Sequence, residues 1–174
     1  MSGKKSIQIV LTAVFAALYS VGVVFLAPIS FQVFQVRVAD ALLPLAMLFG
    51  WPAVVGLSLG AFVANVFGGL GPVDMVGGAL ANFIGTLAAW TLVRGRGKRW
   101  IPVGILFEIL TVTMIVGTYL SYLLAIPLAI SWAGILLGSA IAMGALGSIL
   151  LFALSRRNIL AVLEAHGLSE NAQH

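Results

Sequence analysis

Residues 31–40, Phe-Gln-Val-Phe-Gln-Val-Arg-Val-Ala-Asp, lie between two long apolar runs and concentrate polar side chains where the surroundings are almost entirely hydrocarbon. Arg37 and Asp40 are three residues apart, so on a helix they would share a face and could pair, either to stabilise the fold or to contact a ligand. A charged side chain at bilayer depth costs about 2.5–3.5 kcal/mol on insertion scales, so such residues indicate a functional site. The rest of the chain is interpreted as a membrane scaffold that holds this stretch in place.

The composition defines the class of protein. Of the 174 residues, 61% are hydrophobic and only 8% are charged, whereas charged residues make up about 25% of soluble domains. The apolar runs are continuous and about twenty residues long, which favours membrane-spanning helices over the alternating segments of a β-barrel. We therefore predict an all-α integral membrane protein that forms one membrane domain over residues 1–174.

Proline and glycine clusters divide this domain into six predicted transmembrane helices and a polar tail at 155–174. Eight of the nine Lys and Arg residues then fall on one side of the membrane, and Arg37 is the ninth. The positive-inside rule places that side, with both chain termini, in the cytoplasm. The predicted spans cover residues 7–27, 36–50, 53–67, 73–93, 101–125 and 132–154.

Other polar residues are predicted mostly in the outer half of the spans: Asn65 and Asp74 near the outer ends, Tyr119 in the outer half of the fifth span, and Asn82 further in. Glu108 lies in the inner half of the fifth span. Polarity gathered in the outer half is typical of a site loaded from outside, whereas a channel is polar along its full depth. Each of these residues could instead have a role other than binding a ligand. The asparagines and Asp74 could cap helices or hydrogen-bond between them, Tyr119 could belong to the interfacial aromatic belt, and Glu108 could be a neutral hydrogen-bonded acid or a proton site.

Small residues at four-residue spacing indicate close helix contacts. The pairs Gly56/Gly60 and Gly134/Gly138 favour packing inside the domain. Ala13 and Ala17 lie on a first span with almost no polar residues, and their face could instead bind a partner protein.

Several activities lack any signature in the sequence. The chain has no cysteine, and its two histidines, His166 and His174, lie in the polar tail, so no metal site is predicted. There is no Walker motif for ATP hydrolysis and no metalloprotease or serine-hydrolase motif. We predict neither an enzyme nor a cofactor, and the positive charge is attributed to membrane topology and not to nucleic-acid binding.

Two segments resemble the QueT family. They are Ala-Pro-Ile-Ser-Phe-Gln-Val-Phe-Gln-Val-Arg-Val-Ala-Asp-Ala-Leu at 27–42, and residues 56–82, which run from Gly-Leu-Ser-Leu-Gly to Gly-Gly-Ala-Leu-Ala-Asn. The first span is also similar to that of S components generally, in its residues 12–19. The resemblance implies a substrate-binding S component of an energy-coupling factor (ECF) transporter in a prokaryotic plasma membrane. It also implies that the face of Ala13 and Ala17 docks on the coupling subunit EcfT, which works with two cytoplasmic ATPases.

The same resemblance implies a queuosine precursor of the 7-deazaguanine type as the small-molecule substrate. Gln35, Arg37 and Asp40 match a family motif that ends in Glu, and Asn65 and Asp74 match family positions. Asn82 stands where threonine is expected. Carboxylates and amides suit the N–H edge of such a base, so the predicted substrate-binding residues are Gln35, Arg37, Asp40, Asn65, Asp74, Asn82, Glu108 and Tyr119. The alternatives are another vitamin or purine-like substrate, a small channel, or a self-sufficient carrier in which Glu108 couples transport to protons.

Overall fold

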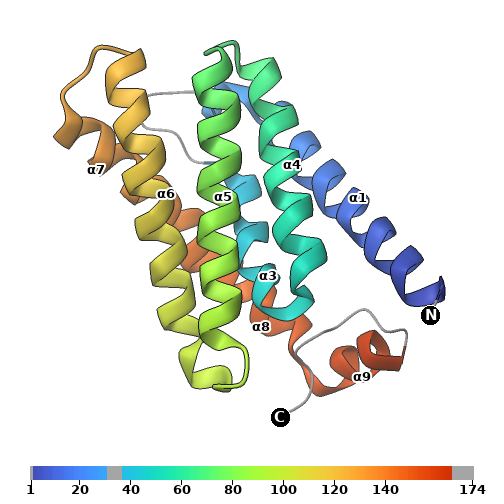
Figure 1. Ribbon diagram of the computed structural model, residues 1–174. Helices are drawn as coiled ribbons and strands as arrows, with labels where there is room; N and C mark the ends of the chain where they lie inside the picture. Colours follow the sequence, from blue (N-terminus) through green and yellow to red (C-terminus); the bar gives the residue numbers. More distant parts are fainter. Residues whose placement is uncertain (1, 31–36, 166–174) are drawn as a thin grey trace.

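The computed structural model describes residues 2–30 and 37–165, which form helices joined by short turns (Figure 1). Five helices of this part of the chain are long and apolar enough to span a membrane. The last of them is continuous from 128 to 154 and includes a π-helical segment. The long helices are α1 (Ser2–Phe25), α4 (Trp51–Gly68), α5 (Pro72–Val93), α6 (Ile101–Leu123) and the run of α7 (Leu128–Ser139), η3 (Ala140–Gly147) and α8 (Ser148–Leu154). The short ones are α2 (Ala27–Ser30), η1 (Val38–Leu45), α3 (Ala46–Phe49), η2 (Lys98–Trp100) and α9 (Arg157–Ala165).

The segment predicted as the second span is shorter than the others. It consists of the 3-10 helix η1 followed by α3, a single α-helical turn. Pro44 lies inside η1. Helical rises of about 2.0 and 1.5 Å per residue make the combined helix about 22 Å long, less than the hydrocarbon core of about 30 Å. The structure therefore gives five helices of spanning length, and the sixth predicted span becomes a buried helix inside the bundle.

This short helix still returns the chain across the bundle. Figure 1 shows η1 and α3 leading from the end where α1 finishes to the end where α4 begins. The start of α1, the α5–α6 turn and α9 all lie at one end, which is where the basic residues collect (Figure 1). We call it the basic end. Its predicted cytoplasmic orientation stays a prediction.

Glycines set the closest helix contacts. A Cβ at Gly56 would lie 2.6 Å from the Thr12 carbonyl oxygen, and one at Gly60 would lie 2.8 Å from that of Ala16. These two glycines therefore let α4 approach the backbone of α1, as predicted for packing inside the domain. A third close contact occurs at Gly147 of the π-helical segment, where a Cβ would lie 3.0 Å from the Ala41 carbonyl oxygen. The missing side chain at Gly147 lets η3 pack against η1.

Candidate functional site

The polar stretch at the start of η1 is held inside the bundle. Arg37 precedes the helix in an extended conformation (φ −79°, ψ 91°), and its Nε donates to the Ser30 carbonyl oxygen at 3.5 Å. Asp40 lies in the first turn, where its Oδ1 accepts a 2.5 Å hydrogen bond from the Tyr19 hydroxyl of α1. The prediction that Arg37 and Asp40 share a helical face is wrong, because the helix begins only at Val38. Their side chains nevertheless line one cavity.

This first cavity lies between η1, α5, α6 and α7. Its volume is about 10 Å³, room for roughly one water molecule. A ligand the size of a purine base therefore requires the surrounding side chains to move outward. The lining residues are Arg37, Asp40, Asn82, Val112, Val116, Ile135 and Ser139.

A second polar cluster lies closer to the end opposite the basic end. The Asn65 amide nitrogen of α4 donates to the Asp74 carbonyl oxygen at 2.8 Å, and the Tyr119 hydroxyl of α6 donates to Asp74 Oδ1 at 2.8 Å. Asp74 Oδ2 and Asn65 Oδ1 are both buried, and neither has a hydrogen-bond partner among the described residues. An unpaired buried acceptor costs about 1–3 kcal/mol, so two together indicate a site prepared for N–H donors.

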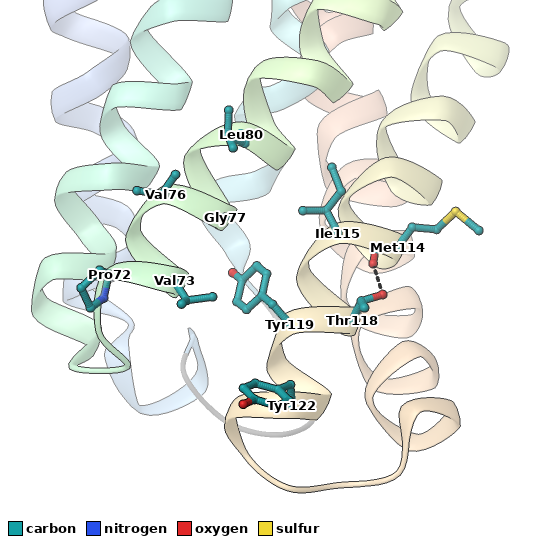
Figure 2. A pocket seen from close by; sticks show the side chains of 10 residues that line it. All are labelled: Pro72, Val73, Val76, Gly77, Leu80, Met114, Ile115, Thr118, Tyr119 and Tyr122. Atoms are coloured by element: carbon teal, nitrogen blue, oxygen red, sulfur yellow. Dashed lines mark hydrogen bonds between the residues drawn. The ribbon is translucent and has the colours of Figure 1, made fainter.

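Two consecutive glycines of α5 make room for this cluster. A Cβ at Gly77 would lie 2.7 Å from Tyr119 Cε1, and a Cβ at Gly78 would clash with the Asn65 amide nitrogen. Figure 2 shows the Tyr119 ring between α5 and α6, beside Gly77. Any larger residue at position 77 would displace the ring from Asp74.

Glu108 lies deeper in α6, on the same helical face as Val112 and Val116 of the first cavity. Its side chain is fully buried, and neither carboxyl oxygen has a hydrogen-bond partner within residues 2–30 and 37–165. Gly85 of α5 lies opposite its backbone.

Charge connects the two clusters. Asp74 and Asn82 lie on one face of α5, eight residues and about 12 Å apart along the helix axis. Arg37 interacts electrostatically with both Asp40 and Asp74. The described interior thus holds three buried carboxyl groups, from Asp40, Asp74 and Glu108, and one buried guanidinium. This set can bind a small ligand that is rich in hydrogen-bond donors.

Six of the eight predicted substrate-binding residues lie in the first cavity or in the second cluster. Arg37, Asp40 and Asn82 share the first cavity, Asn65, Asp74 and Tyr119 form the second cluster, and Glu108 lies below the first cavity. Gln35 lies outside the described residues. The alternative of hydrogen bonds between helices also holds in part, since Asn65 and Asn82 each donate to a backbone carbonyl of a neighbouring helix.

Two residues of this site, Tyr19 and Ser139, were not predicted from the sequence. Tyr19 is fully buried and is the side chain that holds Asp40. It could have been noticed as the one tyrosine within an otherwise apolar first span. Ser139 gave no signal, because serine is common in membrane helices and nothing in its surroundings marks it.

The alanine face of α1 points away from the bundle. Phe15, Tyr19 and Val23 are buried against the other helices, whereas Ala13 and Ala17 are exposed. Among the five spanning helices α1 is the least covered, with 17% of its most apolar window buried. This face is therefore open to lipid or to another protein.

Five helices of spanning length around buried polar groups define a multi-pass membrane protein. The chain matches the family model described as QueT transporter over residues 9–156, and it belongs to the QueT transporter family. No curated protein and no solved structure matches it. Family membership assigns transport of a small molecule across a membrane, and not an enzymatic reaction, to this chain.

Proposed function

We propose that this protein is the substrate-binding S component of an ECF importer in a prokaryotic plasma membrane. Its substrate is a queuosine precursor of the 7-deazaguanine type. The protein captures this molecule at the end of the bundle opposite the basic end. It then passes the molecule to the cytoplasm with the coupling subunit EcfT and two ATPases.

The observation that carries the proposal is the pair of unpaired buried acceptors, Asp74 Oδ2 and Asn65 Oδ1. A guanine-like edge presents adjacent N–H donors, and a carboxylate beside an amide oxygen is a complementary acceptor set. The Tyr119 hydroxyl holds Asp74 Oδ1 and leaves Oδ2 for the ligand. Arg37, Asp40, Asn82 and Glu108 extend the site towards the centre of the bundle, and Gln35 belongs to it by its match to the family motif.

Capture requires the first cavity to expand, because its 10 Å³ cannot hold a base. The side chains of that cavity come from the start of η1 and from α5, α6 and α7, so movement of η1 against these helices would enlarge it. Binding energy from the unpaired acceptors would offset the cost of that movement.

Coupling to EcfT is assigned to α1. Ala13 and Ala17 lie on its exposed face, where small side chains let a partner helix come close. The opposite face of α1 is fixed to α4 through Gly56 and Gly60, so a partner could dock without disturbing the bundle.

Calorimetry on the purified full chain tests the substrate. The ligands are 7-aminomethyl-7-deazaguanine, 7-cyano-7-deazaguanine, guanine and riboflavin. We expect one deazaguanine to bind, and Asp74→Asn to weaken it about ten- to a hundred-fold through loss of a charge-assisted hydrogen bond. Thr113→Val is the matched control, because Thr113 is buried in α6 but belongs neither to the first cavity nor to the hydrogen-bonded cluster of Asp74. Binding of none of these ligands, or equal loss in both variants, would contradict the substrate assignment.

A second candidate function is a self-sufficient carrier in which Glu108 couples transport to protons. It is favoured by the two unpaired oxygens of that buried carboxyl group. Replacing Ala13 and Ala17 together by leucine separates the two functions. An S component would lose ATP-dependent uptake and retain binding, whereas a carrier would retain both. The same change at Ala133 and Ala140, exposed alanines on the last helix, is the control and should leave uptake unchanged.

A further inference from the structure

A groove runs between α5 and α6 near the end opposite the basic end, on the outside of the bundle (Figure 2). Its volume is about 860 Å³, far larger than the cavity beside Arg37 and Asp40. The walls are mostly hydrocarbon, from Val73, Val76, Leu80, Met114 and Ile115.

Two of the three hydroxyl groups along the groove already donate hydrogen bonds within the protein, and the third, of Tyr122, lies at its end. Thr118 donates to the Met114 carbonyl oxygen of its own helix, as Figure 2 shows. Tyr119 donates to Asp74, behind the groove wall. A polar ligand would therefore find few hydrogen-bond partners, and burying its polar groups here would be costly. The groove is suited to an apolar occupant.

The position of the groove identifies that occupant. Val76 is 49% exposed, Leu80 is 50% exposed and Met114 is 56% exposed, and all three lie on helices of spanning length. The groove is thus continuous with the apolar surface that these helices present to the bilayer. From this continuity and the apolar lining we propose that the groove is a binding site for one acyl chain of a membrane lipid.

The dimensions fit a chain within one leaflet. Val73 to Leu80 and Met114 to Tyr122 each correspond to about 11–12 Å of helix, and half of the hydrocarbon core is about 15 Å. Tyr122 is 86% exposed at the end of α6, where an interfacial tyrosine marks the head-group level. The lipid head group lies at Tyr122, and the chain extends towards Leu80.

The bound chain also supports the polar cluster. One side of the Tyr119 ring lines the groove, and the hydroxyl at its tip holds Asp74. An acyl chain packed against the ring opposes its movement away from Gly77. The groove therefore links lipid occupancy to the position of Tyr119, whatever substrate the protein carries.

A phospholipid with a diazirine on one acyl chain tests the site. The full chain is reconstituted with this probe, irradiated and digested, and the labelled peptides are mapped. We expect adducts to concentrate on the facing segments of α5 and α6, compared with exposed segments of α4. In Val76→Trp the indole obstructs the middle of the groove, and we expect about a ten-fold loss of these adducts.

The control is Val63→Trp on α4, a valine that is 44% exposed and lies outside the groove. It should leave the adducts on α5 and α6 unchanged. Leu80→Trp fills the groove from its other end and provides a second variant if Val76→Trp does not fold. Uniform labelling of all exposed helix faces would overturn the proposal, as would equal adduct yields in the groove variants and in Val63→Trp.

Discussion

Replacing Gly77 by alanine should break the hydrogen bond between Tyr119 and Asp74. The added Cβ would lie 2.7 Å from Tyr119 Cε1, so the ring must retreat by about 0.7 Å to reach an ordinary contact of 3.4 Å. The same movement would lengthen the 2.8 Å hydroxyl–carboxylate distance to about 3.5 Å, at which a hydrogen bond is lost. The groove lies on the outer side of the ring, so the retreat displaces whatever apolar chain occupies it.

The magnitude follows from comparison with Gly85→Ala on the same helix. A Cβ at Gly85 meets its nearest atom at 3.6 Å, an ordinary contact, so no side chain has to move. Both variants gain the same helix propensity relative to glycine, which cancels in the comparison. We expect Gly77→Ala to be less stable than Gly85→Ala by about 1.5–3 kcal/mol, the value of a hydrogen bond to a charged group.

Unfolding of the purified full chain in mixed detergent micelles, followed by tryptophan fluorescence, measures this difference. Repeating both variants with Tyr119→Phe removes the hydroxyl, so the difference should shrink to the steric part alone. A difference below about 0.5 kcal/mol, or one that Tyr119→Phe leaves unchanged, would refute the assigned role of Gly77.

Three further predictions concern stability, each measured by the same unfolding titration. Tyr19→Phe should cost about 1.5–3 kcal/mol, because Asp40 loses the donor that holds it at 2.5 Å, and a cost near zero would show that water replaces the hydroxyl. Gly60→Ala should cost about 1–3 kcal/mol, since its Cβ would lie 2.8 Å from the backbone oxygen of Ala16, and a neutral effect would mean that α1 and α4 can separate freely. Glu108→Met should raise stability by about 1–3 kcal/mol by removing two unpaired buried acceptors, while weakening any ligand that Glu108 binds; a loss of stability would reveal a partner for this carboxyl group.

The sequence was most informative where the signal is local. Long apolar runs predicted five helices whose bounds fall within a few residues of those observed, and the glycine pair of α4 predicted its packing contact. The second predicted span was less accurate. Its apolar residues are as typical of a buried core helix as of a membrane crossing, and only its enclosure by the other helices distinguishes the two.

The polar residues of the candidate site were chosen from the sequence by a general rule, that polarity inside a membrane is costly unless it is used. The rule found Arg37, Asp40 and Asn82, which line one cavity. It could not assign Tyr19 to Asp40, because the two residues are 21 positions apart and meet only when α1 packs against η1.

The composition and the spacing of apolar residues by themselves determined that this chain is a helical membrane protein with a polar interior, because each helix buries its backbone polar groups using only its own residues. The tertiary structure alone decided which polar groups remain unpaired. Asp74 and Tyr119 are 45 residues apart in the chain, and their contact depends on the absence of a side chain at Gly77, which lies on the same helix as Asp74. Contacts of this kind arise from the close approach of helices, which depends on the packing of all of them together and not on the sequence of any one.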